Sequence, residues 1–335
     1  MRALVCKSWG EPSESLEIQT LPDPKAGWMQ VVVKMIASPI NPSDLLTIRN
    51  QYGRQPALPF VPGFEGVGRV VSGGGLLSGG GPLAWRVMGK RVAVIAADGG
   101  AWADHCVIPA IRAIPLPDSI PTDQAASFFV NPATAWAMVR NVLGVRPGDL
   151  LIQSAAAGAV GQMILGLSKH LGFGVIHVVR REDQAAQLRQ MGAREVIVGQ
   201  GEELVPMIKK MVGSRTCRFG LDAIGGETGS AILKSLGRHG ILLSYGRLSG
   251  QPIPVEPGTL LDGMKRIQGF WLSEWMKDQN KLTLWRLFGR LTKLISSGVI
   301  QTPPGPVFSM ENHKQAVEEA AKAGKTGKVL LRFDQ

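Results

Sequence analysis

The sequence is poor in the residues that build disulfide or metal frameworks. Of its 335 residues only three are cysteine, Cys6, Cys106 and Cys217, and only five are histidine. The wide spacing of the cysteines excludes a disulfide framework and a zinc knuckle, and it is typical of a reducing compartment. Zinc needs three or four nitrogen, sulfur or oxygen ligands. The scattered histidines and cysteines offer no such set, so we expect no bound metal.

Long apolar runs are also missing. No stretch of about 18 residues is apolar and uncharged enough to span a bilayer, which excludes a membrane-spanning helix. The first residues, MRALVCKSWGEPSESLEI, hold neither a secretory apolar core nor an Arg- and Ser-rich, acid-poor presequence. We expect a cytoplasmic protein, or one from an organelle matrix if a presequence has been removed.

Acidic residues are the scarcer charge. Lys and Arg number 37 against 26 Asp and Glu, which gives a net charge of +11. The cations are spread along the chain, and the longest clusters are pairs such as Arg180-Arg181 and Lys209-Lys210. This pattern favours a few cations that serve an anionic ligand over a nucleic-acid partner.

The first 125 or so residues are typical of a β-rich domain. Short β-branched runs alternate with Gly and Pro, and the prolines break any long helix. These features predict an antiparallel barrel or sandwich. The segment from Val71 to Trp85 carries two Gly triplets. We interpret it as a flexible loop between two strands rather than a phosphate cradle.

The pattern changes near Thr122. Two helical pieces, interrupted at Asn131-Pro132, lead into a regular alternation of strands and helices that continues to about residue 245. Such alternation predicts a parallel sheet covered on both faces, and therefore an α/β fold. An aromatic segment, a long helix and a final helix, turn and strand complete the chain.

A small-residue turn follows the first strand of this series. It matches the dinucleotide pattern G-x-G-x-x-G, with alanine in the first place. Gly158, in the second glycine position, allows a pyrophosphate to approach the backbone, and Gly161, in the third, allows the helix to pack on the strand. The candidate cofactor-binding residues of the turn are Ala156, Gly158, Ala159, Val160 and Gly161.

The end of the second strand indicates which cofactor is bound. An acid there would hold a ribose 2′-hydroxyl, but this chain has Arg180 and Arg181. Guanidinium groups suit a 2′-phosphate, so we predict NADPH. The alternative is two solvated arginines at the start of a helix. Tyr245, at the carboxyl edge of the sheet, is a further cofactor contact, and Lys328 is a weaker phosphate candidate.

Four further stretches carry a family likeness. They are INPSD at 40–44, QYG at 51–53, VNPATA at 130–135 and GFWLS at 269–273. With them, the sequence resembles the medium-chain dehydrogenase/reductase superfamily over essentially its full length. Within it, the chain is similar to trans-2-enoyl thioester reductases of the mitochondrial fatty-acid-synthesis type, near the quinone oxidoreductases. Phe64 stands where zinc-dependent relatives have a histidine.

The resemblance implies a GroES-like β-barrel catalytic domain and a Rossmann domain. The expected boundaries are 1–125 for the catalytic domain, completed by 300–335, and 126–299 for the NADP-binding domain. The implied reaction is NADPH-dependent reduction of the C=C bond of an enoyl-CoA or acyl-carrier-protein thioester. A homodimer is the implied assembly.

The resemblance also assigns roles to individual residues. Tyr52 would donate a proton or a hydrogen bond as charge develops on the carbonyl oxygen. Asn41, Asn131 and Thr134 would face the nicotinamide and the reacting carbonyl, although Asn41 also suits a turn and Asn131 a helix cap. Phe270 and Trp271 would line an acyl pocket, although aromatic residues in such a segment also suit a core.

Two other functions stay open at this stage. The first is a zinc-independent NADPH reductase of quinones or alkenals on the same scaffold. The second is a relative that keeps the cofactor fold as a lens or RNA-binding protein, against which the scattered charge and the polar site residues argue.

Overall fold

The computed structural model describes residues 1–53, 55–74, 81–322, 324 and 327–333. The chain forms two compact units. Unit 1 contains residues 1–131, 285–298 and 302–335, and unit 2 contains residues 132–284 and 299–301. The domain boundaries expected from the sequence remain a prediction. The compact units differ from them mainly at residues 285–298, which cluster with unit 1.

The described part of unit 1 is built on a seven-stranded sheet with the order β14-β15-β3-β4-β5-β7, in which β6 also pairs with β3. The long strand β3 (Gln30–Pro39) organises it. One edge of β3 pairs with β6 over residues 30–34 and with β15 over residues 37–39, while β4 occupies the other edge. The other strands are β4 (Glu65–Gly73), β5 (Arg91–Ile95), β6 (His105–Pro109), β7 (Ala113–Pro115), β14 (Pro304–Ser309) and β15 (Lys328–Arg332).

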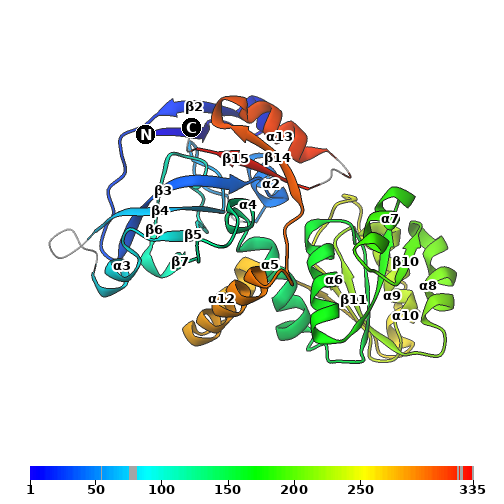
Figure 1. Cartoon of the computed structure of the whole chain (residues 1–335). Helices are drawn as coiled ribbons and strands as arrows, with labels where there is room; N and C mark the ends of the chain where they lie inside the picture. The colour runs from blue at the N-terminus through cyan, green and yellow to red at the C-terminus, as the bar shows by residue number, and fades with distance from the viewer. Residues whose placement is uncertain (54, 75–80, 323, 325–326, 334–335) are drawn as a thin grey trace. The chain divides into compact units, whose positions relative to one another are not determined.

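Short helices and a two-stranded ribbon complete unit 1 around this sheet (Figure 1). β1 (Arg2–Cys6) pairs antiparallel with β2 (Leu16–Thr20). The core joins buried residues from the strands with others from the helices, and Trp102 and Met35 are among its largest members. The helices are α1 (Pro12–Ser15), α2 (Pro42–Ile48), α3 (Gly81–Val87), α4 (Thr122–Ala126) and α13 (His313–Ala321), with the 3-10 turns η2 (Ala110–Arg112) and η5 (Met310–Asn312).

The loop expected from Val71 to Trp85 is only partly correct. β4 extends to Gly73, residues 75–80 lie outside the described residues, and α3 begins at Gly81. Pro82 lies in the first turn of this helix, where its missing N–H costs nothing. Ala84 and Val87, one turn apart, are buried and anchor α3 on the sheet.

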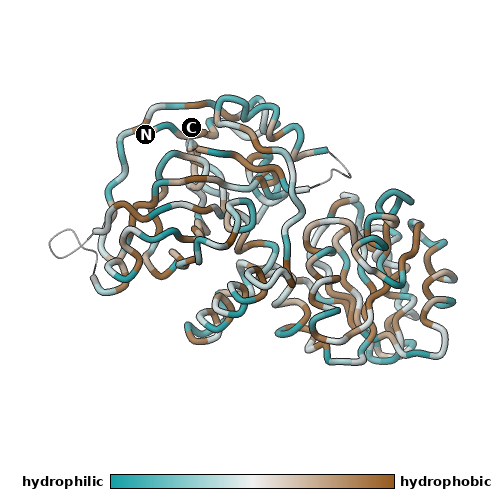
Figure 2. The backbone as a smooth tube through the Cα atoms, viewed as in Figure 1, coloured by the Kyte–Doolittle hydropathy of each residue, from teal (hydrophilic) through white to brown (hydrophobic). Residues whose placement is uncertain are grey.

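Unit 2 confirms the parallel α/β sheet. Its described residues form a six-stranded sheet with the order β10-β9-β8-β11-β12-β13, in which every pair is parallel. Figure 1 shows α6 on one face of this sheet and α8 on the other, and Figure 2 shows the hydrophobic strands between them. The strands are β8 (Leu150–Gln153), β9 (Gly174–Val179), β10 (Glu195–Val198), β11 (Cys217–Asp222), β12 (Ile241–Ser244) and β13 (Arg266–Gly269).

The helices of unit 2 follow the strands as predicted. The covering helices are α6 (Ala159–Leu171), α7 (Glu182–Gln190), α8 (Leu204–Val212) and α9 (Gly226–Ser235), with shorter α10 (Pro257–Leu261) and α11 (Leu272–Lys277) and the 3-10 turn η4 (Gly201–Glu203). The predicted long helix is α12 (Lys281–Ser296), whose residues from Trp285 onward cluster with unit 1.

The predicted helix break at Asn131-Pro132 is displaced. The chain leaves α4 at Ala126 and starts α5 (Val130–Trp136) before these two residues, and a π-helical stretch (Ala137–Val142) continues it. Pro132 therefore lies in the first turn of α5, where a helix tolerates proline. As a result Asn131 and Thr134, three residues apart, lie on the same face of one helix.

Among the described residues, no helix combines the length and the apolar character needed to cross a lipid bilayer.

Candidate active site

The predicted dinucleotide turn of unit 2 has the geometry that its sequence implies. Gly158 is the N-cap of α6, and the turn reaches it through Ala155, whose φ is +49°. A Cβ atom on Gly161 would lie 2.4 Å from the carbonyl oxygen of Ala156, so no other residue fits without a shift of the helix. The first N–H groups of α6 have no partner within the helix. The turn can therefore hold an anion such as a pyrophosphate.

A buried pair that the sequence analysis missed supports this turn. The Gln153 side chain donates from Nε2 to the carbonyl oxygen of Gly161 at 3.0 Å and to Nδ1 of His177 at 2.7 Å. Burial, helped by the positive charge of Lys169, lowers the pKa of His177 to about 4. The imidazole is therefore neutral near pH 7, with Nδ1 as the acceptor.

A second polar group lies at the carboxyl edge of the same sheet. Ser154, after β8, donates its hydroxyl to Asp222 Oδ1 at 2.6 Å, and Asp222 also accepts the backbone N–H groups of Ile224 and Gly225. Burial raises the pKa of Asp222. In the sequence, the available signal for this group was an aspartate at the end of a predicted strand, Asp222 of β11. Tyr245 donates its backbone N–H to the Asp222 carbonyl, and burial raises the pKa of its hydroxyl, which stays protonated.

The two predicted 2′-phosphate ligands differ in their surroundings. Both follow β9 and are exposed. Arg181 is the N-cap residue of α7 and makes a bidentate contact with Asp183, at 2.9 and 3.0 Å. That hydrogen bond lowers the pKa of Asp183. The backbone N–H of Arg180 donates to Gln184. Because Asp183 engages the guanidinium of Arg181, Arg180 is the stronger candidate for the 2′-phosphate. This acid was visible in the sequence.

The aromatic segment of unit 2 follows β13. Phe270 is buried and donates its backbone N–H to Ser244 of β12, while Trp271 is half-buried at the N-cap of α11. The rings of Phe270 and Trp275 lie 6.4 Å apart. Phe270 is therefore tied to the end of the sheet, and its role in an acyl pocket stays a prediction, as does that of Trp271.

In unit 1, Asn41 and Lys328 belong to a network of buried charges. Lys328 Nζ donates to the side-chain oxygen of Asn41, whose Nδ2 donates to Glu65 Oε1 at 3.0 Å. Asp44 accepts the backbone N–H groups of Asn41 and Phe64, at 2.7 and 3.1 Å. All four side chains of the network, Asn41, Asp44, Glu65 and Lys328, are at most 6% exposed.

The electrostatics of this network follow from burial. Removal from water raises the pKa values of Asp44 and Glu65 and lowers that of Lys328, while the attraction between the cation and the carboxylates opposes each shift. Both ends of the Asn41 amide are engaged, and the Lys328 ammonium faces carboxylates. Asn41 and Lys328 are thus placed to position other groups, and their contacts with substrate and phosphate stay a prediction.

Glu65 connects the network to the predicted site helix. Its Oε2 accepts the backbone N–H groups of Phe129 and Val130, at 2.9 and 3.0 Å. These donors lie at the start of α5, so the buried carboxylate fixes the beginning of the helix that carries Asn131 and Thr134. Both of those side chains are half-buried.

Tyr52 lies in the loop after α2. It is half-buried, its ring lies 6.1 Å from the ring of Phe64, and its carbonyl oxygen accepts the Gln55 side chain at 2.7 Å. Unit 1 thus brings Tyr52 beside Phe64, which stands where zinc-dependent relatives have a histidine.

Comparison with known proteins places this geometry in a family. Residues 27–118 match the alcohol dehydrogenase GroES-like domain, and residues 159–288 match the family described as zinc-binding dehydrogenase. The human mitochondrial enoyl-[acyl-carrier-protein] reductase is 32% identical, over 99% of this chain and 88% of its own length. A Caenorhabditis elegans protein of the same name is 30% identical, over 95% and 91% of the two chains.

The chain belongs to the medium-chain dehydrogenase/reductase superfamily. Two solved members show the same fold. The Escherichia coli quinone oxidoreductase complexed with NADPH has a TM-score of 0.89 at 26% identity, and covers 99% of this chain and 100% of its own. The Thermus thermophilus quinone oxidoreductase has a TM-score of 0.83 at 28% identity, with the same coverage.

Within this superfamily, the chain is a member of the zinc-free branch. Phe64 occupies the position of a zinc-ligating histidine, and among the described residues no three His, Cys, Asp or Glu side chains are grouped as metal ligands. The residues present therefore do not fit the zinc that one of the matched families is named for.

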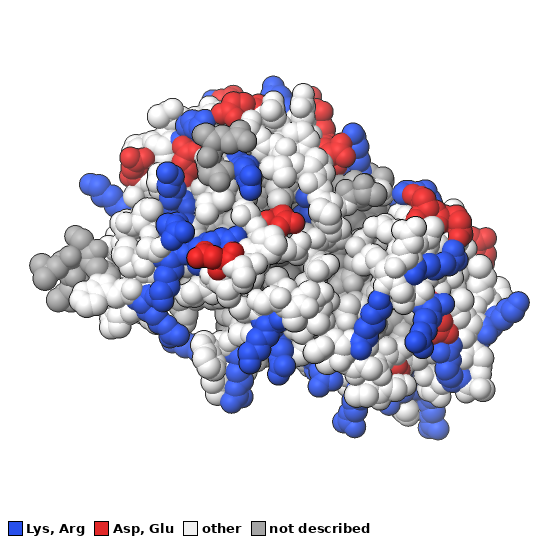
Figure 3. Space-filling model, viewed as in Figure 1, with Lys and Arg blue, Asp and Glu red and all other residues white. Residues whose placement is uncertain are grey.

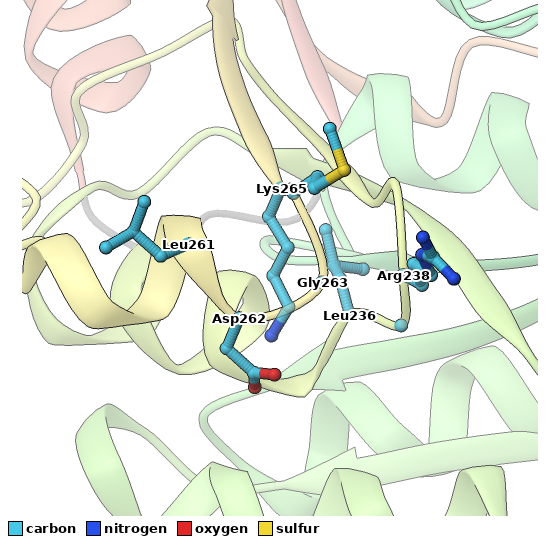
Figure 4. Close-up of a pocket in the computed structure, with 8 residues that line it drawn as sticks. Leu236, Arg238, Leu261, Asp262, Gly263 and Lys265 are labelled. Atoms are coloured by element: carbon cyan, nitrogen blue, oxygen red, sulfur yellow. The ribbon is translucent and has the colours of Figure 1, made fainter.

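A pocket of about 480 Å³ lies elsewhere in unit 2 (Figure 4). Its walls are the segments that precede β12 and β13, which puts it at the amino edge of the parallel sheet. Dinucleotides bind superfamily members of this sheet type at the carboxyl edge, so this pocket is not the cofactor site. Its labelled lining residues are Leu236, Arg238, Leu261, Asp262, Gly263 and Lys265.

Proposed function

We propose that the protein is an NADPH-dependent reductase of trans-2-enoyl thioesters. In this reaction a hydride is added to the β-carbon of the C=C bond and a proton to the α-carbon. The observation that carries the proposal is the near-full-length similarity to enoyl-[acyl-carrier-protein] reductases, at 32% identity for the human protein. The acyl group would arrive as a coenzyme A or carrier-protein thioester.

The residues of unit 2 suit the proposed cofactor. The turn from Ala156 to Gly161, with Ala159 and Val160 at the start of α6, offers N–H groups to a pyrophosphate. Arg180 and Arg181 offer guanidinium groups to a 2′-phosphate, and Tyr245 ends a neighbouring strand. NADPH bound to two solved relatives supports the same choice. When bound, NADPH supplies the hydride.

The polar residues at the predicted site would handle the developing charge and the proton. The Tyr52 hydroxyl would donate a hydrogen bond to the thioester oxygen or a proton to the α-carbon. Asn131 and Thr134, on one face of α5, would orient the nicotinamide and the carbonyl. Asn41 would act through Glu65, which fixes the start of that helix.

A second candidate function is the reduction of quinones or alkenals with NADPH. This function is favoured by the two solved quinone oxidoreductases described above, whose TM-scores reach 0.89. The aromatic residues Phe270 and Trp271 would then contact a ring rather than an acyl chain.

A parallel assay distinguishes the two functions. NADPH oxidation would be followed with crotonyl-CoA, with a longer enoyl-CoA and with a quinone, and the measurements would be repeated with NADH. We expect fast turnover of an enoyl-CoA with NADPH. Turnover of the quinone alone would establish the second function, and a preference for NADH would contradict the role of the arginines.

Tyr52→Phe tests the chemical step. The substitution keeps the ring that packs near Phe64 and removes only the hydroxyl. We expect kcat to fall by at least about tenfold, on the scale of a positioned acid, while the KM for NADPH is unchanged. An unchanged kcat would remove Tyr52 from the mechanism.

The proposed setting follows the named relatives. Their mitochondrial names support an organelle matrix, and the cytoplasm is the alternative. We propose that no nucleic acid is bound; a salt-sensitive complex with RNA would contradict this.

A further inference from the structure

One end of unit 1 exposes large apolar side chains. Trp28 is 62% exposed and Trp85 is 69% exposed, so most of each indole faces water. Isolated apolar residues are common on protein surfaces, but contiguous apolar patches mark interaction sites. We call this surface the α3 face, and its residues are Trp28, Met29, Leu83, Trp85, Met88 and Ile111.

Backbone contacts bring together the segments that carry these residues. Trp28, just before β3, forms an isolated bridge with Gly74, just after β4. The carbonyl oxygen of Met29 accepts the N–H of Ala110 at 2.8 Å, at the start of η2. α3 in turn packs against η2, β4 and β7. Figure 1 shows α3 at the side of unit 1 where β3 begins.

The side chains of α3 are arranged opposite to the usual pattern. The helix buries only its small residues Ala84 and Val87 against the sheet. Its larger apolar residues, Leu83 and Trp85, face outward, and Met88 follows them at the end of the helix. A surface helix normally places its bulky apolar side chains in the core. The core therefore does not explain why these side chains are large and apolar.

The surroundings of the α3 face are cationic. Residues 24–34, 66–97 and 105–117, the segments that meet here, contain no Asp or Glu and seven Lys or Arg. Figure 3 shows Lys and Arg beside the white surface at α3. Arg112 pairs with Asp98 at 3.4 Å, and Arg91 is buried. Arg112 is half-buried, and the exposed cations are Lys25, Lys34, Arg69, Arg86 and Lys90.

We propose that the α3 face docks on an anionic lipid surface. Two exposed indoles with Met, Leu and Ile side chains suit the boundary between headgroups and acyl chains, where tryptophan is enriched. The surrounding cations suit the negative charge of the headgroups. A symmetric contact with a second copy would instead bring Arg86 and Lys90 toward the same cations of the copy, where like charges repel.

The test is cosedimentation of the full-length protein with vesicles. We expect binding to phosphatidylcholine vesicles that contain phosphatidylserine, much weaker binding to phosphatidylcholine alone, and a loss of binding in high salt. Trp85→Ala removes an apolar anchor, and Arg86→Glu with Lys90→Glu reverses two charges. Each variant should lower the partition coefficient by about tenfold. All substituted side chains are exposed, so turnover of NADPH should be unchanged.

Matched variants elsewhere control for general effects. Trp285→Ala removes another indole, which is 66% exposed, on α12. Lys209→Glu with Lys210→Glu makes the same change in net charge on α8 of unit 2. Neither should lower the partition coefficient by more than about twofold. The proposal would be overturned if the controls lost as much binding, or if the protein did not bind anionic vesicles. It would also be overturned if Trp85→Ala kept vesicle binding and lowered the oligomeric mass instead.

Discussion

At the scale of single residues, the buried charges of unit 1 are the most constrained feature. Lys328 balances Glu65 and Asp44, and Asn41 bridges the cation to Glu65. Breaking one partner of a buried ion pair is costly because the other charge stays uncompensated. The same network fixes the start of α5. Glu65 therefore contributes both to the free energy of unfolding and to the placement of the helix that carries Asn131 and Thr134.

A double-mutant cycle measures this coupling. Lys328→Met leaves two buried carboxylates without their cation and should lower the free energy of unfolding by about 3 kcal/mol. Glu65→Gln should also be destabilising, while the double variant should cost at least about 1 kcal/mol less than the two single losses together. Lys314→Met, at an exposed position of α13, is the control and should cost about 0.5 kcal/mol or less. Additive losses in urea unfolding would show that Glu65 and Lys328 do not interact.

His177 gives a prediction of pH dependence. Burial lowers its pKa to about 4 from its usual 6.5, so the unfolded chain binds this proton more readily than the folded one. The stability that depends on a neutral His177 is present above pH 6.5 and is lost as the pH falls toward 4. The full loss is about 3 kcal/mol. Lowering the pH from 7 to 5 should lower the free energy of unfolding by about 2 kcal/mol through this residue.

His177→Asn should remove that pH dependence, because the amide can accept from Gln153 without titrating. His170→Asn, at an exposed position of α6, should retain it. Urea titrations at the two pH values, followed by circular dichroism, measure the difference. If His177→Asn loses as much stability between pH 7 and 5 as the unchanged protein, His177 is not the titrating group.

At the scale of elements, the glycine turn depends on close packing between α6 and the end of β8. A Cβ on Gly161 would meet the Ala156 backbone at 2.4 to 2.7 Å. Gly161→Ala should therefore displace the start of α6, weaken NADPH binding at least about tenfold and cost about 1–3 kcal/mol of stability. The Kd from a fluorescence titration with NADPH is the measurement.

Gly289→Ala is the matched control for that substitution. Gly289 lies within α12, and nothing lies within 4 Å of where its Cβ would be. The change should raise the free energy of unfolding by about 1 kcal/mol and leave the NADPH Kd unchanged. Equal NADPH affinity of the two variants would mean that the cofactor does not use the turn.

The elements that the sequence predicts well share a strong pattern. The strands and helices from β8 to β12 alternate apolar runs with clear glycine stops, and the structure confirms them. β13 and β14 were missed because they carry no comparable apolar run: every residue of β13 is exposed, and β14 contains two prolines. α3 was missed because two glycine triplets precede its short helical stretch.

The candidate site was predictable where it depends on local sequence. The turn at Gly158 and the arginines after β9 lie next to the strands that position them. The network of Asn41, Glu65 and Lys328 could not be predicted, because its members are up to 287 residues apart and meet only when β15 pairs with β3. Glu65 follows Phe64 directly in the sequence. The residues around it, however, give no sign that its carboxylate accepts the backbone N–H groups of residues 129 and 130.

At the scale of the whole molecule, the sheet of unit 2 has two unlike edges. The edge strand β10 is shielded by α7 and α8, and its central residues are buried. β13, at the other edge, has all four residues exposed, including Ile267 at 39%. An exposed edge strand presents unpaired N–H and C=O groups to another chain. The homodimer expected from the family resemblance would cover this edge.

We therefore predict that two copies pair through β13 in antiparallel fashion and extend the sheet. Ile267→Asp places a charge in that contact and should convert the dimer to a monomer, because like charges would face each other across the symmetric interface. Met207→Asp is the matched control, since Met207 is also 39% exposed but lies on α8. Light scattering coupled to gel filtration measures the mass of each variant. If the unsubstituted protein is a monomer, or if the dimer survives Ile267→Asp, β13 is not the contact. The next strand to test would then be β14, an exposed edge strand of unit 1.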